Sequence, residues 1–402
     1  MKRIGLLTSG GDCQALNATM RGVAKTLYNA DPDTQIFGFE EGYRGLMYND
    51  YILMKPNDFS GILTKGGTIL GSSRQPFKLM RVPGENGFNK VEAMKATYRN
   101  LKLDCLVILG GNGTQKTANL LSEEGLNIVS LPKTIDNDLV HTDHTPGFGS
   151  AARYVASTVR EITLDANVYE KKSVTIVEIM GRHAGWLTAA SALARKYTGD
   201  NPLLIYLPET AFDTEEFLKK TEACFEKNCN VVVCVSEGIH DNKGTFICEY
   251  DNSIGTDTFG HKMLAGCGKY LENLVRSRLG VKARSIELNV SQRCSASMLS
   301  DTDRQEAITA GIFGVQAALK GETGKMVSFI RQETSEGVYQ MRCGLEDVNK
   351  ICNEEKTVPL SWISQDGSDV TEDFIHYARP LIQGNVELPM GEDGLPVCVY
   401  RK

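Results

Sequence analysis

The stretch from Leu106 to Asp138 limits what this chain can fold into more than any other part of the sequence. An unbroken apolar run, Cys105 to Leu109, leads into it and is typical of a parallel strand that is buried on both faces. The run ends at three glycines within Gly110 to Thr114, and a helical pattern follows directly. Glycines allow a sharp turn and the close approach of a ligand, while the free N–H groups at a helix start attract an anion. The sequence therefore predicts a phosphate-binding loop between a buried strand and a helix.

A second strand is expected from Ile128 to Leu131, and it leads to three polar residues, Thr134, Asp136 and Asp138. Two carboxylates at positions i and i+2 lie on one face of an extended segment, so we expect both to converge on a metal-bound phosphoryl group. A strand, a glycine loop, a helix, a strand and a carboxylate pair together make a far more specific pattern than the glycine loop alone.

The bulk composition narrows the classes of partner. With 402 residues the chain is long enough for two domains with substantial cores. A net charge of −6 gives no general attraction to nucleic acid or to an anionic membrane, so an anionic substrate would have to be held by clustered arginines. Eleven cysteines without a Cys-x-x-Cys pair favour a reducing cytoplasm and no zinc site. The apolar run near the N-terminus is too short for a signal peptide, and no segment reaches membrane-spanning length.

Further strand and helix patterns extend the α/β reading along the chain. A strand, a glycine turn at Thr8 to Asp12 and a helix open the sequence, and a proline-free helical segment from Gly147 to Tyr169 marks a crossover into a second domain. The fold predicted is α/β with mainly parallel sheets. The remaining predicted strands are Ile4 to Leu7, Ile36 to Phe39, Val174 to Ile179, Leu203 to Leu207 and Val231 to Val235.

Two loops place arginines where they could meet phosphate. A glycine-rich loop from Gly66 ends in the guanidinium of Arg74, whose planar fork matches phosphate oxygens. The strand that ends at Ile179 leads into Met180, Gly181 and Arg182. Two strands farther on end in acids, Glu209 and Glu237, which in an open α/β sheet would face the ligand crevice. Glu209 has no role assigned from its position beyond capping the next helix.

At the glycine loop and at Pro132 to Asp138, which runs Pro-Lys-Thr-Ile-Asp-Asn-Asp, the sequence closely resembles the phosphofructokinase family. Further matches run from Ile4 to about Gly311, and the tail resembles that of longer members. The resemblance implies two Rossmann-like domains with the active site in the cleft between them. It implies a phosphoryl-donor domain over residues 1–147, a sugar-phosphate domain over 148–291, and a C-terminal part, 292–402, that returns to both domains and adds a tail.

The resemblance also implies roles for individual residues. The expected catalytic residues are Asp136 as general base, Thr134, Arg74 and Arg182. The donor would be bound by Gly11, Tyr43 in a loop near the nucleoside, Arg74, Gly111, Asn112, Gly113 and Thr114. Fructose 6-phosphate would be bound by Thr134, Ile135, Asp136, Met180, Gly181, Arg182, Glu237, Arg284 and Arg293. Asn112 and Asp138 would hold Mg²⁺. Arg284 acts from a neighbouring subunit in the family, which implies a homodimer or homotetramer.

Two positions bear on the choice of donor in opposite directions. Pyrophosphate-using relatives carry aspartate at position 113, where its carboxylate repels the α-phosphate of ATP, whereas Gly113 leaves that space open. Lys133 is the residue of pyrophosphate users and of a mixed group of ATP users, and its ammonium can neutralise a diphosphate leaving group. Residues 1 to 131 resemble ATP users more closely, and Thr142 to Ala194 resemble pyrophosphate users.

Other departures from the family pattern leave a second class of function open. Asn112 replaces the usual aspartate, Val290 the usual histidine and Ser173 a neighbouring-subunit arginine, with Lys172 beside it. The main expectation is a cytoplasmic, glycolytic 6-phosphofructokinase that uses ATP and Mg²⁺ to phosphorylate the 1-hydroxyl of fructose 6-phosphate. The alternatives are a pyrophosphate-dependent phosphotransferase and a catalytically weak sugar-phosphate or nucleotide sensor. An NAD or lipid kinase shares only the glycine loop and is ranked last.

Overall fold

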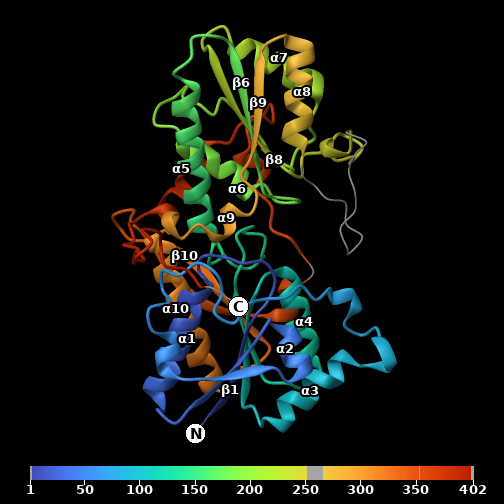
Figure 1. Cartoon of the computed structure of the whole chain (residues 1–402), viewed down its shortest axis with the longest axis vertical. Coiled ribbons are helices and arrows are strands. Elements are labelled where there is room, and N and C mark those ends of the chain that lie inside the picture. The colour runs from blue at the N-terminus through green and yellow to red at the C-terminus, as the bar shows by residue number, and fades with distance from the viewer. Residues whose placement is uncertain (1, 251–265, 353, 400–402) are drawn as a thin grey trace. The chain divides into compact units, whose positions relative to one another are not determined.

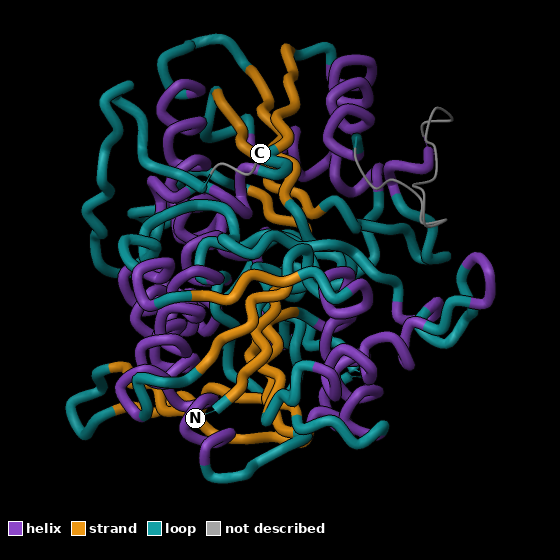
Figure 2. The backbone as a smooth tube through the Cα atoms, turned by 60° about the horizontal axis from the view of Figure 1, so that its bottom comes forward, coloured by secondary structure: helices purple, strands orange, loops and turns teal. Residues whose placement is uncertain are grey.

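The computed structural model describes residues 2–250, 266–352 and 354–399 (Figure 1). The chain divides into two compact units, each built from segments that are distant in sequence. Unit 1 contains residues 1–150, 293–355 and 383–402, and unit 2 contains residues 151–292 and 356–382. Each unit has its own sheet, with helices on both sides of the strands (Figure 2).

The sheet of unit 1 has seven strands in the order β11-β10-β5-β4-β1-β2-β3. The pairs β1/β2, β1/β4, β4/β5 and β5/β10 are parallel, while β3 and β11 add antiparallel edges. The strands are β1 (Arg3–Thr8), β2 (Gln35–Phe39), β3 (Tyr51–Met54), β4 (Cys105–Gly110), β5 (Ile128–Pro132), β10 (Lys325–Glu333) and β11 (Tyr339–Asp347). The helices are α1 (Leu16–Ala30), α2 (Tyr43–Tyr48), α3 (Lys90–Asn100), α4 (Asn112–Glu123), α10 (Asp301–Leu319) and α11 (Val348–Ile351).

Hydrophobic burial explains why the centre of this sheet forms. Every residue of β4 and β5 is buried, as expected for parallel strands that helices cover on both faces. In Figure 1, α1 and α10 lie on one face of the sheet, and α2, α3 and α4 lie on the other. The two helices of the first face approach closely, because a Cβ at Gly22 would lie 2.4 Å from the carbonyl oxygen of Ile308. Only glycine permits this contact, so α10, although distant in sequence, belongs to the same core as α1.

Unit 2 has a parallel four-stranded sheet in the order β7-β8-β6-β9. Its strands are β6 (Ser173–Ile179), β7 (Leu204–Tyr206), β8 (Asn230–Ser236) and β9 (Lys282–Glu287). The helices include most of α5 (Phe148–Ala166), then α6 (Trp186–Ala189), α7 (Thr214–Cys224), α8 (Cys267–Leu279) and α12 (Glu372–Ala378), and α9 (Ser291–Cys294) lies at the boundary of the units. The mainly parallel α/β class predicted from the sequence is confirmed in both units.

The C-terminal segment of unit 2 is an integral part of that unit. The amide of Ile205 in β7 donates to the carbonyl of Ser368, at 2.8 Å. The ring of Trp186 contacts Trp362 and Tyr377, with centroids 6.1 and 5.3 Å away. Residues 356–382 therefore complete a core that the earlier part of unit 2 leaves open. Over the described ranges of both units, we find no helix with the length and apolarity needed to span a membrane.

Candidate active site

The glycine loop of unit 1 has the geometry that the sequence predicts. Strand β4 ends at Gly110, Gly111 is the N-cap residue, and α4 begins at Asn112. The first N–H groups of an α-helix have no acceptor within the helix, so the start of α4 offers hydrogen-bond donors that suit an anion. Gly113 is exposed, and a Cβ added there would meet no atom within 4 Å. The space in front of Gly113 is therefore open.

A second turn lies beside the glycine loop, because β1 and β4 are adjacent parallel strands. The amide of Ser9 donates to the carbonyl of Leu109 at 2.9 Å, which brings the turn at Gly10 and Gly11 to the end of β4. Ser72 donates through its hydroxyl to the carbonyl of Gly10, at 2.5 Å. The loop that carries the exposed Arg74 is therefore tied to the same edge of the sheet.

Lys133 is the buried cation of this edge. Its side chain extends from the end of β5, is only 4% exposed, and donates through Nζ to the carbonyl of Gly11. Burial lowers the pKa of Lys133, while the negative charges of Asp12 and Asp136 oppose that effect. The guanidinium of Arg293 lies about 3.7 Å from the Cβ position of Gly11. Two cations thus flank the turn at Gly11.

The acid loop, residues 134–138, is a bend and not an extended segment, so the argument that Asp136 and Asp138 share one face of an extended chain does not apply, and their convergence on a phosphoryl group stays a prediction. The hydroxyl of Thr134 accepts the N–H of Asp136 at 3.0 Å, and Asn137 has a φ of 54°. An asparagine tolerates this left-handed conformation better than most residues, because its short polar side chain can bond locally. Ile135 and Asn137 are buried, whereas Asp136 is exposed. The loop therefore presents one carboxylate to solvent from an otherwise buried backbone.

The predicted metal ligands fit Mg²⁺ as judged from the chemistry of their oxygens. Asn112 donates through Nδ2 to the carbonyl of Glu354 at 3.3 Å, and its Oδ1 is buried without a hydrogen bond. Such an oxygen is a suitable hard ligand, and the carboxylate of Asp138 supplies another from the acid loop. Among the described residues, no three His, Cys, Asp or Glu side chains form a metal cluster. A small number of protein ligands is sufficient for Mg²⁺, because this ion usually keeps water and substrate phosphate in its coordination shell.

Tyr43 was expected in a loop, but it is the first residue of the helix α2. Its ring is 1% exposed, and its hydroxyl donates to the carbonyl of Thr114 at 2.9 Å. The phenol therefore supports the start of α4 from within the core. Contact between Tyr43 and the donor stays a prediction.

In unit 2, the predicted sugar-phosphate residues follow the ends of two neighbouring parallel strands, β6 and β8. The amide of Gly181 donates to Oε1 of Glu237 at 3.5 Å, and the hydroxyl of Ser236 donates to the carbonyl of Gly181. Met180 is half-buried, and the guanidinium of Arg182 lies 5.9 Å from the ring centroid of Phe246. The structure thus brings Met180, Gly181, Arg182 and Glu237 together at one edge of the sheet.

The two remaining arginines belong to different units. Arg284 lies in β9 of unit 2, where its guanidinium is 3.1 Å from the carboxylate of Asp165. Arg293 lies in α9 and belongs to unit 1, beside Gly11. Their expected roles at the sugar 6-phosphate, including action across subunits, stay predictions.

Glu209 has a role that its sequence context does not reveal. It does not cap α7, whose N-cap is the side chain of Asp213. Its Oε1 instead accepts the amides of Gly185 and Val358, both at 2.8 Å. Burial raises the pKa of Glu209, and these two hydrogen bonds oppose that effect. Glu209 therefore joins the segment after Arg182 to the C-terminal part of unit 2, a contact with no local sequence signal.

Comparison with known proteins gives consistent matches along the chain. The family profile described as "Phosphofructokinase" matches residues 3–318. The pyrophosphate–fructose 6-phosphate 1-phosphotransferase of Xanthomonas campestris is 36% identical, over 98% of this chain and 94% of its own length. The ATP-dependent 6-phosphofructokinase of Spirochaeta thermophila is 38% identical, over 81% of this chain and 87% of its own. The crystal structure of a pyrophosphate-dependent phosphofructokinase from Marinobacter aquaeolei superposes with a TM-score of 0.86 at 27% identity, covering 100% of this chain and 98% of that one.

Proposed function

Because the chain belongs to the phosphofructokinase family of phosphotransferases, we propose that it transfers the γ-phosphoryl group of ATP to the 1-hydroxyl of fructose 6-phosphate. The observation that carries the choice of ATP is the open space at Gly113, where an added Cβ would meet nothing within 4 Å. An aspartate there would place a negative charge against the α-phosphate of ATP, and Gly113 places none. The start of α4 then supplies N–H groups to the donor phosphates.

In the proposed reaction, Asp136 accepts the proton of the 1-hydroxyl as that oxygen bonds to the γ-phosphorus. The bond between the γ-phosphorus and the bridging oxygen breaks, and ADP leaves. The exposure of Asp136 on a buried loop supports this role, because the carboxylate is accessible while its backbone is fixed. Thr134 shapes the loop through its hydroxyl, and Ile135 contributes its backbone groups to the binding of fructose 6-phosphate.

We assign the stabilisation of negative charge on the transferred phosphoryl group to two arginines, one from each unit. Arg74 comes from unit 1 and Arg182 from unit 2, and each would stabilise negative charge on that group. Asn112 and Asp138 would hold Mg²⁺, which when bound neutralises charge on the donor phosphates. Met180, Gly181, Glu237, Arg284 and Arg293 are assigned to fructose 6-phosphate. We further expect a cytoplasmic protein. We also expect it to be a homodimer or homotetramer, and sedimentation of the purified protein would test this oligomeric state.

Pyrophosphate is the second candidate donor, and Lys133 favours it. Its buried ammonium lies at the turn of Gly11, where it could pair with a short diphosphate leaving group. Relatives named for pyrophosphate use also align with nearly the complete chain. The identity of the donor therefore depends on two features: the open space at Gly113 favours ATP, and the charge of Lys133 favours pyrophosphate.

The deciding experiment is an initial-rate assay with fructose 6-phosphate, Mg²⁺ and either ATP or pyrophosphate as the only donor. We expect kcat/KM for ATP to exceed that for pyrophosphate by at least about tenfold. An Asp136→Asn variant purified in the same way controls for contaminating kinases. The opposite ratio would overturn the proposed donor. Tight binding of fructose 6-phosphate without turnover by either donor would instead indicate a sensor.

A further inference from the structure

The segment of residues 142–147, which follows the acid loop, is largely buried, although it forms neither helix nor strand. Thr142, His144 and Thr145 are 5, 1 and 0% exposed. Buried irregular backbone needs hydrogen-bond partners, and a side chain of this segment supplies one to the acid loop. The hydroxyl of Thr145 donates to the carbonyl of Thr134 at 2.7 Å, and Thr134 also pairs with Gly147 in a parallel bridge. Residues 145–147 therefore lie along the start of the acid loop.

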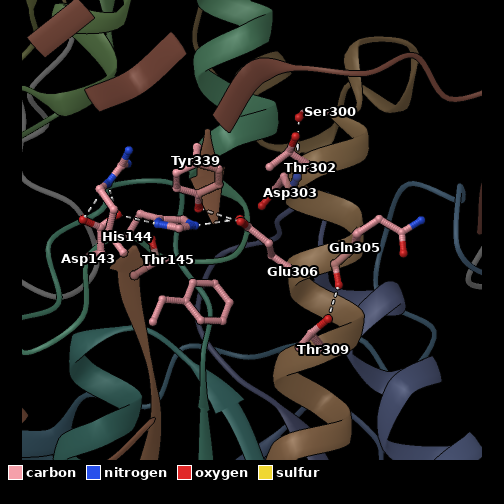
Figure 3. Close-up of polar contacts among 12 residues, drawn as sticks. Asp143, His144, Thr145, Ser300, Thr302, Asp303, Gln305, Glu306, Thr309 and Tyr339 are labelled. Carbon is pink, nitrogen blue, oxygen red and sulfur yellow. Dashed lines mark hydrogen bonds and ion pairs between the residues drawn. The ribbon is translucent and has the colours of Figure 1, made fainter. Parts of the chain in front are cut away.

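The side chain of His144 is clamped between two carboxylates (Figure 3). Its Nδ1 lies 2.8 Å from Oδ2 of Asp143, and its Nε2 lies 2.7 Å from Oε2 of Glu306. The doubly protonated imidazolium donates to both carboxylates at once. Each of the two carboxylates is held by a second donor: Tyr339 donates to Glu306 at 2.6 Å, and Arg331 donates to Asp143 at 3.1 Å. One loop residue is thus fixed to α10, β10 and β11.

Asp303 anchors the other end of the same segment. This carboxylate is 2% exposed, and it accepts the amide of Gly147 at 2.8 Å and the amide of Ser150 at 3.2 Å. Asp303 and Glu306 lie one turn apart on α10, which places both carboxylates on one side of the helix. Helix α10 therefore holds the chain on both sides of Thr145.

We propose that His144 and Thr145 are positioning residues for phosphoryl transfer. The clamp on His144 fixes Thr145, the hydroxyl of Thr145 fixes the carbonyl of Thr134, and Thr134 in turn bonds the amide of Asp136. Neither residue is assigned a contact with substrate or donor. The inference rests on the proposed function through the role of Asp136.

The central test is a pair of substitutions at Thr145 with a matched control. Thr145→Val keeps the shape of the side chain and removes the hydroxyl, whereas Thr145→Ser keeps the hydroxyl. Thr221 in unit 2 is the control, because it is also 0% exposed and donates to a carbonyl, that of Phe217, at 2.8 Å. We expect kcat to fall about 100-fold in Thr145→Val, since a small misplacement of a reacting group can cost that much. The KM values should stay within about threefold of wild type in every variant. Thr145→Ser and Thr221→Val should keep kcat within the same range.

Hydrogen–deuterium exchange gives a second readout that does not depend on turnover. In Thr145→Val, we expect the amides of residues 135–139 to exchange at least about tenfold faster, while peptides from β6 and β8 stay unchanged. His144→Gln retains the Thr145 hydroxyl but places an amide between two carboxylates, and we expect the same peptide to exchange faster. This variant serves if Thr145→Val does not fold.

The outcomes separate this inference from the proposed function. Unchanged kcat and unchanged exchange in the folded Thr145→Val protein, or equal losses of kcat in Thr145→Val and Thr221→Val, would overturn the positioning role. If wild type turns over neither donor, the proposed function fails, but exchange at residues 135–139 still decides whether Thr145 holds the acid loop.

Discussion

The ammonium group of Lys133 donates a hydrogen bond to the carbonyl of Gly11, so the end of β5 is joined to the turn that follows β1. This bond places a buried positive charge at the turn that we propose to contact the phosphoryl donor. Lys133→Met keeps most of the stem volume and removes the charge. We expect the KM for ATP to rise about tenfold and the KM for pyrophosphate to rise further, because a short anion depends more on one cation. Lys78→Met, at an exposed lysine of the same unit, should change neither value. Equal KM values in wild type and Lys133→Met would remove Lys133 from donor binding.

Substitution at Gly113 separates charge from volume in donor selection. Gly113→Asp should lower kcat/KM for ATP by about 100-fold, because a carboxylate would face the α-phosphate, while pyrophosphate use is kept or improved. Folding should be unaffected, since an acid in the first turn of α4 stabilises a helix. Gly113→Asn has nearly the same volume without the charge and should lose much less. Donor kinetics of the two variants check this, and equal losses would show that volume decides.

Loss of the exposed carboxylate of the acid loop should abolish most turnover. In Asp136→Asn we expect kcat to fall by about 100- to 10,000-fold, the range for removal of a general base. Binding of fructose 6-phosphate, measured by calorimetry, should change little, because the amide keeps the shape of the side chain. Asp50→Asn, at another exposed aspartate of unit 1, should leave kcat unchanged. Near-normal turnover of Asp136→Asn would falsify its role as the base.

The clamp on His144 predicts a specific dependence of stability on pH. Burial alone would lower the pKa of His144, but the carboxylates of Glu306 and Asp143 outweigh burial and raise the pKa to about 9. Because the folded-state pKa is raised, this stabilisation is complete below the unfolded-state pKa of about 6.5 and is lost as pH rises through about 9. The shift corresponds to a stabilisation on the order of 3 kcal/mol. Thermal unfolding of wild type between about pH 6.5 and 9.5 should show the decline in Tm.

Two variants check the assignment of that decline. His144→Gln lacks the titrating group, so its Tm should be lower at neutral pH and should change less over the same range. His376→Gln makes the same substitution at an exposed histidine of α12 and should follow wild type. Parallel pH profiles for His144→Gln and wild type would show that another group is responsible.

Much of unit 1 could be predicted because its determinants are local. The apolar run of β4, the glycines that end it and the helical period of α4 lie within one continuous stretch, and each is a direct consequence of burial or backbone freedom. The strands β5, β6 and β8 are also buried along their whole length, although Ser130, Thr175 and Glu178 interrupt their apolar residues. The same locality allowed the acid loop and the segment Met180 to Arg182 to be predicted as the residues that follow buried strands, whereas their contact with ligands stays a prediction.

The parts that could not be predicted depend on contacts between distant residues or on a single backbone angle. His144 and Glu306 are separated by 162 positions, and the pairing of Glu209 with Val358 spans 149, so neither contact has a periodicity to detect. At Asn137, one left-handed residue changes the direction of the loop, whereas the argument from the sequence assumed an extended segment with both carboxylates on one face. At Tyr43, the glycine before it suggested a loop, but burial of the ring favours a short helix.

The division of the chain into interleaved segments limits how the protein can be built and dissected. Unit 1 takes residues from both ends of the chain, and unit 2 takes back residues 356–382 after unit 1 has received 293–355. Neither half can therefore be produced from one uninterrupted stretch of gene. During synthesis on the ribosome, the sheet of unit 1 cannot be completed before β10 has been made. The aromatic cluster around Trp186 likewise stays incomplete until Trp362 and Tyr377 have been synthesised. A stop codon near residue 355 would thus leave the core of unit 2 incomplete, although it removes only the last stretch of the polypeptide.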